Sequence, residues 1–409
     1  MDVFVGRQAI LDQRLRTHGY ELLFRSGEVN EFDGTEGAEA TSRLIVNTYL
    51  TMGADSILGG KPGFINFPRS LLVDGSWKAL PRGGTVIELL ETILPDREVM
   101  EACRKLKSNG YRFALDDYAG ASGYDELLGM ADYVKVDFRL TGEKVRRSLA
   151  VDLARRGVRA VAEKVETREE YEAARGMGYT LFQGFFFTRP VVIAGRDIRE
   201  SKSGCMNIIR ELQFSELDFP RLENSIRQDL SVAHKLLRYV NSALYGRRVA
   251  ITSIREAIVI LGEDELRRWL SLIVLARMGV DQPPEAVTIC LARARFCEAV
   301  AAKTGNTSRQ PDYFLMGLFS LLDLMLGRPL GAVLGELKLP EDVTASLLQM
   351  KPNAHTSRTY ALARACEGAQ WGTIFELATQ IALEPSATAA LYADAVAWSD
   401  RTLGQMLAA

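Results

Sequence analysis

Histidine, cysteine and an excess of charge of either sign are all scarce in this sequence of 409 residues. It contains three histidines, so we expect no histidine-rich metal centre. The five cysteines are odd in number and form no CxxC pair, which indicates reduced thiols and excludes a disulfide framework or a thiolate zinc site. Fifty basic side chains against 52 acidic ones give a net charge of -2, so we expect no nucleic-acid partner.

Long hydrophobic runs are absent as well. The longest apolar stretch, 313–326, is interrupted by Asp323 and is shorter than the roughly 20 residues that a transmembrane helix needs. The N-terminus lacks a basic segment followed by an apolar one, so we expect no signal peptide. The content of 47% hydrophobic and 25% charged residues is ordinary for a globular protein. We therefore expect a cytoplasmic protein without a membrane segment, and its length suggests two domains.

The first half of the chain alternates between strand and helix patterns. Eight short runs of β-branched and aromatic residues are separated by segments with helical periodicity. The runs cover residues 3–11, 20–24, 63–67, 85–91, 112–118, 133–138, 160–165 and 181–187. Eight such units favour a (β/α)8 barrel over an open sheet. Only a turn separates the first two runs, so we expect an antiparallel start and hence a modified TIM-like barrel.

Two helices of this half carry clear signals at their ends. Within 96–108, Val99, Cys103 and Leu106 fall on one face, and Gly110 follows as a left-handed stop. Thr167 and Glu170 have the spacing of a capping box that opens a helix over 168–175.

The second half has helical patterns alone. From about residue 201 the strand signal disappears, and seven segments carry helical periodicity: 218–230, 232–242, 254–261, 263–278, 284–304, 313–326 and 388–408. We place the boundary near 198–204, which gives a barrel over 1–200 and an all-helical domain over 201–409. The fold class is therefore α/β followed by all-α.

Seven successive strand runs carry a polar side chain in or just after an apolar stretch. These residues are Glu21, Asn66, Glu88, Asp116 with Asp117, Lys135, Glu163 and Gln183. In barrel enzymes the reacting groups project from the C-terminal ends of the strands. An isolated buried charge there costs several kcal/mol, so the ordered set favours convergence on a cation. A single residue of this kind would more often be a structural group.

The oxygen donors in this set suit a hard cation, Mg²⁺ or Mn²⁺, rather than zinc. The four donors are Glu21, Asn66, Glu88 and Asp116. Asp117 is a candidate ligand for a second ion, because pairs of ions about 3.5–4 Å apart recur in phosphoryl-ester hydrolysis. Lys135 is a candidate to orient the attacking water, and Glu163 to remove its proton.

Eight ordered motifs resemble those of the EAL-domain cyclic di-GMP phosphodiesterases. The segment that starts at Glu21 resembles the E-x-L-x-R signature, and the segment that starts with Asp116 and Asp117 resembles the D-D-F segment. The other likenesses cover 7–10 (RQAI for Q-P-I), 64–66 (FIN), 87–91 (IELLE for E-x-T-E), 134–137 (VKVD for K-x-D), 162–167 (AEKVET for A-E-G-V-E-T) and 183–190 (Q-G-aromatic through proline). Together they span about 190 residues of this chain.

The resemblance implies hydrolysis of one phosphodiester bond of cyclic di-GMP to give linear pGpG, with one or two Mg²⁺ or Mn²⁺ ions. It implies metal ligation by Glu21, Asn66, Glu88 and Asp116, with Asp117 for a second ion, and action on the water by Lys135 and Glu163. It further implies substrate contacts from Gln8, Arg25 and Gln183, and support of the loop after Asp117 by Glu91 and Glu166.

Two departures from the family pattern leave every expected ligand in place. The family's Gly-Thr-Gly-Tyr-Ser-Ser loop after the aspartate pair is AGASGYD here, over 119–125, and the glycine of A-E-G-V-E-T is Lys164. Both bear on turnover rate and on regulation through the loop. They leave open an alternative, a weak or inactive cyclic di-GMP receptor or scaffold that signals through the helical half. A scaffold in which neither half meets nucleotide is a third reading.

The helical half resembles the HDOD domain, a relative of the HD phosphohydrolases. The likeness rests on 236–243 (LLRYVNSA) and 254–262 (IREAIVILG), while 317–320 (GLFS) stands where an HD enzyme has its His-Asp pair. No His-Asp dipeptide occurs in the chain, so a dinuclear HD centre is excluded. The order of the halves resembles EAL–HDOD signalling proteins. That likeness implies a regulatory module binding an unknown protein partner, and suggests a homodimer through the barrel.

Overall fold

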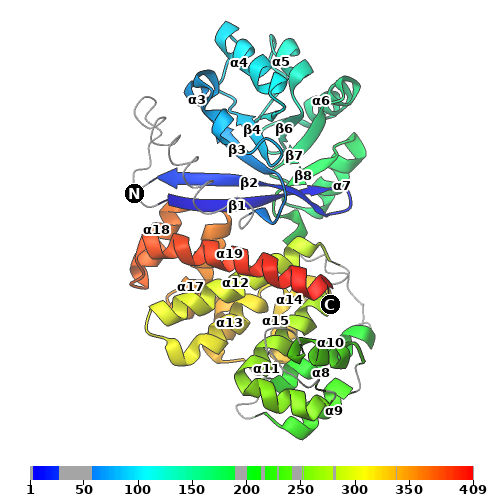
Figure 1. Ribbon diagram of the computed structural model, residues 1–409, viewed down its shortest axis with the longest axis vertical. Helices are drawn as coiled ribbons and strands as arrows, with labels where there is room; N and C mark the ends of the chain where they lie inside the picture. Colours follow the sequence, from blue (N-terminus) through cyan, green and yellow to red (C-terminus); the bar gives the residue numbers. More distant parts are fainter. Residues whose placement is uncertain are drawn as a thin grey trace. The chain divides into compact units, whose positions relative to one another are not determined.

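The computed structural model (Figure 1) describes residues 3–26, 58–188, 200–212, 217–227, 230–241, 251, 253–279, 282–337 and 339–408. The chain forms two compact units, Met1–Arg189 with Ala361–Ala397, and Pro190–Tyr360 with Trp398–Ala409. Helix α8 (Glu200–Leu212) already runs through most of the stretch in which we placed the domain boundary. The boundary at residue 200 itself stays a prediction.

Among the described residues, eight strands close into a barrel in chain order. The strands are β1 (Val3–Asp12), β2 (Thr17–Ser26), β3 (Gly63–Phe67), β4 (Thr85–Leu89), β5 (Arg112–Leu115), β6 (Tyr133–Asp137), β7 (Arg159–Glu163) and β8 (Leu181–Gln183). Strand β1 is antiparallel to both of its neighbours, and the neighbouring pairs from β2 to β8 are parallel. The predicted barrel and its antiparallel start are confirmed.

A layer of apolar side chains fills the barrel interior. Its members are at most 3% exposed: Ile10, Phe64, Val86, Ala114, Tyr133, Val161 and Leu181. Full burial of side chains of this size contributes about 1.5–3 kcal/mol each to stability. Successive side chains of each strand point to opposite sides of the barrel wall, so every second residue contributes to this interior.

Helices cover the outside of the barrel (Figure 1). They are α3 (Arg69–Asp74), α4 (Arg97–Ser108), α5 (Asp125–Met130), α6 (Glu143–Arg156) and α7 (Arg168–Met177), with short 3-10 turns at Ser76–Ala79 and Phe186–Thr188. Helix α4 buries the predicted face, and the Asp96 carboxylate caps it by accepting from the Val99 amide at 2.9 Å. Helix α7 opens with the predicted capping box of Thr167 and Glu170.

The second half is helical, as predicted. Its described helices are α8, α9 (Phe219–Arg227), α10 (Leu230–Val240), α11 (Ile254–Met278), α12 (Pro284–Lys303), α13 (Gln310–Leu318), α14 (Leu322–Leu326), α15 (Leu330–Gly335), α16 (Glu341–Leu347), α17 (His355–Glu367), α18 (Trp371–Gln380) and α19 (Pro385–Ala408), with a 3-10 turn at Thr307–Arg309. Within the part of the chain that the structure describes, no helix is both long and apolar enough to span a bilayer.

Candidate active site

The polar side chains predicted for the site form the next layer of the barrel interior. On six parallel strand segments the polar residue stands two positions after a member of the apolar layer, so the two side chains face the same way. The pairs are Phe64 with Asn66, Val86 with Glu88, Ala114 with Asp116, Tyr133 with Lys135, Val161 with Glu163 and Leu181 with Gln183. Strand β1 runs the other way, and there Gln8 precedes Ile10 by two positions.

The Lys135 ammonium joins four carboxylates in this polar layer. Its Nζ lies 2.8 Å from Glu163 Oε1 and 3.1 Å from an oxygen of each of Glu21, Glu88 and Asp116. The Lys135 side chain is 1% exposed, and Glu88 is fully buried. With every group ionised, four negative charges therefore face one positive charge in a buried space.

Burial and crowding of like charges raise the pKa of three of these carboxyls. Burial is the main cause for Glu163 and raises its pKa to about 8 despite the nearby Lys135. Burial likewise raises the pKa of Asp116, and it holds the pKa of Glu88 well above its ordinary value, helped by the neighbouring carboxylates. A cation in this space would relieve the repulsion.

Glu21 and Lys135 are shifted toward their charged forms. Burial disfavours the Glu21 carboxylate, but the Lys135 ammonium and hydrogen bonds from Gln183 and Asn66 outweigh it and lower the Glu21 pKa. Burial also opposes the Lys135 charge, but the carboxylates, Glu163 first among them, raise its pKa well above the usual value. This ammonium therefore stays protonated throughout the neutral range.

Several buried oxygens of the predicted metal ligands and of Gln183 accept no hydrogen bond from a described residue. They are Asn66 Oδ1, both Glu88 carboxylate oxygens, Asp117 Oδ1 and Gln183 Oε1. Glu88 Oε1 lies 3.1 Å from Lys135 Nζ, at ion-pair distance but outside hydrogen-bond geometry. A buried acceptor without a partner costs about 1–3 kcal/mol. Such oxygen donors beside surplus negative charge fit a divalent Mg²⁺ or Mn²⁺ ion.

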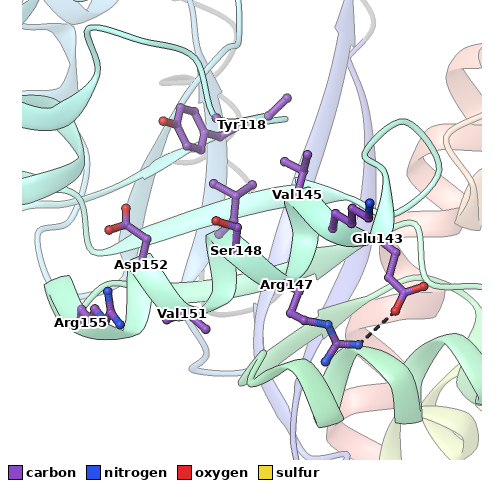
Figure 2. Close-up of a pocket in the computed structure, with 12 residues that line it drawn as sticks. Tyr118, Glu143, Val145, Arg147, Ser148, Val151, Asp152 and Arg155 are labelled. Atoms are coloured by element: carbon purple, nitrogen blue, oxygen red, sulfur yellow. Dashed lines mark hydrogen bonds and ion pairs between the residues drawn. The ribbon is translucent and has the colours of Figure 1, made fainter.

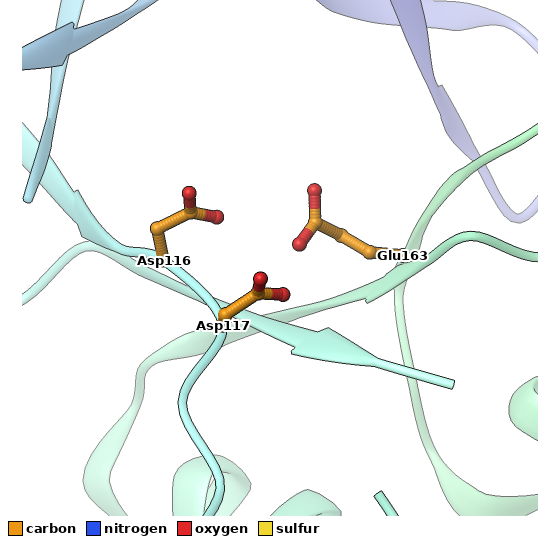
Figure 3. A group of neighbouring side chains, drawn as sticks. All are labelled: Asp116, Asp117 and Glu163. Atoms are coloured by element: carbon orange, nitrogen blue, oxygen red, sulfur yellow. The ribbon is translucent and has the colours of Figure 1, made fainter. Parts of the chain in front are cut away.

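Asp116, Asp117 and Glu163 form a group of carboxylates that could hold a metal ion. One oxygen from each lies within 4.8 Å of the others, and Figure 3 shows the three carboxylates grouped together. The amides of Asp116 and Tyr118 still bond to the neighbouring strands, donating to the carbonyls of Leu89 and Lys135 at 2.9 and 3.0 Å. Asp117 between them has a φ of 43°, a left-handed conformation that aspartate tolerates better than most residues.

The amide side chains predicted to meet substrate join the same network. Gln183 Nε2 donates to Glu21 Oε2 at 2.6 Å and to Gln8 Oε1 at 2.8 Å, and Asn66 Nδ2 donates to Glu21 Oε1 at 3.2 Å. The structure thus brings Gln8, Gln183 and Asn66 together with the carboxylates. Arg25 lies on β2, but its side chain is outside the described residues.

Glu91 and Glu166 are the two residues predicted to support the loop after Asp117. Glu91 is exposed on the turn after β4 and has no hydrogen bond or ion pair with a described residue. Glu166 pairs with Arg139, which follows β6. The Tyr124 hydroxyl in this loop donates to the carbonyl of Ile93, two residues after Glu91, at 3.1 Å. Loop support by Glu91 and Glu166 stays a prediction.

Sequence reasoning gave no role to a second charged group at the edge of the site. Lys164 Nζ lies 2.5 Å from Asp137 Oδ2 and 3.5 Å from Asp117 Oδ2. Asp137 follows Lys135 by two positions on β6, and its other oxygen accepts the amides of Arg139 and Leu140. The two-residue spacing from Lys135 and the lysine in place of the family glycine were the signals that could have revealed it.

The helical half has no comparable group of metal-binding side chains among its described residues. Residues 317–320 stand where, by the family resemblance, an HD enzyme has its His-Asp pair. There the buried Ser320 hydroxyl accepts a hydrogen bond from Arg293 at 3.0 Å.

A pocket outside the barrel lies beside the loop that follows Asp117. Tyr118, Ala119 and Gly120 line one side, and residues of α6 line the other (Figure 2). Val145 and Val151 of α6 are 41% and 45% exposed. This face combines apolar and charged side chains next to the site.

Comparisons with known proteins agree with the order of the two halves. Residues 61–190 match the EAL domain model, and residues 202–330 match the HDOD domain model. The solved complex of Klebsiella pneumoniae BlrP1 with calcium and cyclic di-GMP is 26% identical, covering 46% of this chain and 56% of that chain with a TM-score of 0.38.

Two full-length relatives extend the likeness over nearly the whole chain. The uncharacterised Bacillus subtilis protein YuxH is 34% identical over 407 residues, which are 97% of this chain and 98% of YuxH. The Vibrio cholerae cyclic di-GMP phosphodiesterase CdgJ is 37% identical over 350 residues, which are 84% of this chain and 80% of CdgJ. With its EAL domain followed by an HDOD domain, the chain belongs to the EAL–HDOD protein family.

Proposed function

We propose that the barrel hydrolyses one phosphodiester bond of cyclic di-GMP to give pGpG, with the HDOD half as a regulatory or partner-binding module. The main support is the convergence of Glu21, Glu88, Asp116 and Glu163 on Lys135. The likeness to CdgJ, which is named as a cyclic di-GMP phosphodiesterase, supports the substrate.

The proposed reaction uses one or two Mg²⁺ or Mn²⁺ ions. Glu21, Asn66, Glu88 and Asp116 would hold the first ion, and Asp117 would contribute to a second. A bound divalent ion supplies positive charge that stabilises a phosphoryl-transfer transition state. The buried oxygens without hydrogen-bond partners on Asn66, Glu88 and Asp117 support this assignment.

Each remaining polar group has a defined task in the proposal. Glu163 accepts the proton of the attacking water once a bound cation favours its ionised form, and the burial that raises its pKa makes it a stronger base than an ordinary carboxylate. Lys135 stays charged and holds the water through its ammonium. Gln8, Gln183 and Arg25 contact the nucleotide.

The test is turnover of cyclic di-GMP by the full chain in Mg²⁺ or Mn²⁺, compared with EDTA, with chromatography of the products. We expect pGpG only with metal. Glu163→Gln should lower turnover by about 10²- to 10⁴-fold, the usual contribution of a general base. Glu21→Gln should abolish turnover, because it removes a proposed ligand of the metal ion. Glu101→Gln, on the exposed face of α4, is the control. Unchanged turnover in the two site variants would refute the proposal.

A receptor that binds cyclic di-GMP without cleaving it is the second candidate. The observation that favours it is Lys164, whose ammonium lies 3.5 Å from Asp117. Calorimetric binding without product over hours in Mn²⁺ would favour this candidate. A scaffold that binds no nucleotide would not be stabilised against thermal unfolding by cyclic di-GMP with metal. A ligand at 100 times its Kd adds about 2.7 kcal/mol to the free energy of unfolding.

A further inference from the structure

The chain after β7 is held in a conformation that a lysine rarely adopts. Lys164 has a φ of 54°, in the left-handed region where residues other than glycine are strained. The neighbouring backbone is clamped, because the Val165 amide donates to the Gln183 carbonyl at 3.0 Å and the Phe186 amide to the Val165 carbonyl at 3.2 Å. The backbone of Lys164 is therefore fixed at the barrel edge, while its side chain is 46% exposed.

This conformation carries the Lys164 ammonium to two aspartates at the mouth of the barrel. Nζ lies 2.5 Å from Asp137 Oδ2, and Asp137 has a side chain only 4% exposed. Asp137 is also fixed by the amides of Arg139 and Leu140, at 2.6 and 2.9 Å from its Oδ1. A buried carboxylate held at three points thus anchors the ammonium beside the site.

The second aspartate is Asp117, the proposed ligand of a second ion. Its Oδ2 lies 3.5 Å from Lys164 Nζ, and its Oδ1 is buried and accepts no hydrogen bond from the described part of the chain. The ammonium therefore compensates the Asp117 charge from one side. A second divalent ion on that side would face a fixed positive charge, and like charges at short range in a partly buried site repel strongly.

We propose that the Lys164 ammonium takes the electrostatic place of a second metal ion, so that this site binds one divalent ion tightly and a second only weakly. The inference rests on the proposed metal-dependent function. It assigns a positioning role to a residue that differs from the glycine of the family pattern. One oxygen of Asp117 stays available to the first ion, beside Asp116 and Glu163.

The test measures manganese binding to the full chain without nucleotide, by electron paramagnetic resonance of free Mn²⁺ and by calorimetry. We expect one tight site per wild-type chain. Lys164→Gly and Lys164→Met should each add a second site bound at least about tenfold more tightly than in the wild type. Lys164→Arg, which keeps the charge, should retain one site.

Lys105→Met on the exposed face of α4 is the matched control, and it should leave binding unchanged. Thermal unfolding of each variant checks that the barrel is folded. Two tight sites in the wild type, or one site in both uncharged variants, would overturn the inference and leave the proposed function standing. Absence of bound Mn²⁺ in every protein would overturn both.

Discussion

At the scale of single residues, Lys135 determines the charge balance of the site. Removing its ammonium leaves the buried carboxylates of Glu21, Glu88, Asp116 and Glu163 without their shared partner. Removing one partner of a buried ion pair typically costs 3–5 kcal/mol, while a ligand that binds the folded state restores stability.

Lys135→Met should therefore lose roughly 3–5 kcal/mol of unfolding free energy in EDTA and gain more from Mn²⁺ than the wild type does. Urea denaturation with and without the ion measures both effects. Lys107→Met is the control. Lys107 pairs with Asp132 in a partly exposed position, where an ion pair contributes about 1 kcal/mol or less to the free energy of unfolding. Equal stability of Lys135→Met and wild type in EDTA would contradict the expected burial of charge.

His18 gives a second prediction, about pH. Burial, followed by the charges of Arg159 and Arg112, lowers its pKa from 6.5 to about 4. Below pH 6.5 the unfolded chain binds a proton that the folded chain binds only near pH 4, so stability falls as the pH falls through this window. Because the ring is partly exposed, we expect a loss of about 1–2 kcal/mol.

His18→Gln should remove that part of the acid destabilisation, measured as unfolding free energy at pH 7, 5.5 and 4.5. His234→Gln on α10 is the control. An unchanged slope in His18→Gln would show that His18 is not the source.

Individual residues also show what the sequence could and could not reveal. The polar layer was predictable, because a period of two places Glu88 and Lys135 on the same inward face as their apolar neighbours. The pairing of Lys164 with Asp137 could not be predicted from the hydrophobic pattern, because it depends on a left-handed residue in a loop, and the family glycine at this position was the sequence signal for it. No pattern of hydrophobicity records that dihedral angle.

At the scale of elements, several strands end earlier than their apolar runs. The runs predicted to end at 91, 118, 165 and 187 correspond to strands that end at Leu89, Leu115, Glu163 and Gln183. Asp117, Lys164 and Gly184 have positive φ values just beyond the last three of these ends. The apolar pattern continues because loop residues such as Tyr118, Val165 and Phe186 are still buried, whereas the ladder hydrogen bonds end where the backbone turns.

Gly184 provides a prediction at this scale. Its φ is 143°, and a Cβ there would lie 2.0 Å from the Val165 carbonyl oxygen. Gly184→Ala should therefore cost about 3 kcal/mol, from the clash and the strained backbone together, and should displace the loop that carries Lys164.

Thermal or urea unfolding measures the effect of Gly184→Ala. Gly176→Ala in α7 is the matched control, because a Cβ there meets nothing within 4 Å and should stabilise the helix by about 0.5–1 kcal/mol. Equal behaviour of the two variants would contradict the close approach at Gly184.

The helices of the second half were predicted only in part. Gly262, with φ 71° and ψ 174°, interrupts α11 and separates the two predicted segments 254–261 and 263–278. Helices α15 and α16, of six and seven residues, were missed because periodicity needs a longer window. The longer helices α8, α17 and α18 were missed as well. The predicted helix over 313–326 is divided between α13 and α14.

At the scale of the whole molecule, the proposed homodimer through the barrel gives a fourth prediction. Val145 and Val151, which line the pocket beside α6, are 41% and 45% exposed, and Leu140, three residues before α6, is 81% exposed. Burying such side chains between two copies would remove apolar surface from water. Val145→Glu with Val151→Glu should convert a dimer to a monomer in analytical ultracentrifugation.

Val259→Glu, at a residue 75% exposed in the helical half, is the control for that experiment. A wild-type chain that sediments as a monomer at all concentrations, or a double variant that stays dimeric, would contradict this interface.

The two-residue offset between the apolar layer and the polar layer ties assembly of the barrel to its chemistry. If one strand shifted its register by a single residue, its apolar core side chain and its polar site side chain would both turn to the outside of the barrel. A barrel with a misaligned strand therefore cannot be well packed, so a well-packed barrel also has the side chains of the proposed active site in place. Substitution of Phe64 or Val161 by a smaller residue should thus disturb the positions of the polar side chains in the neighbouring layer, although it changes no polar atom.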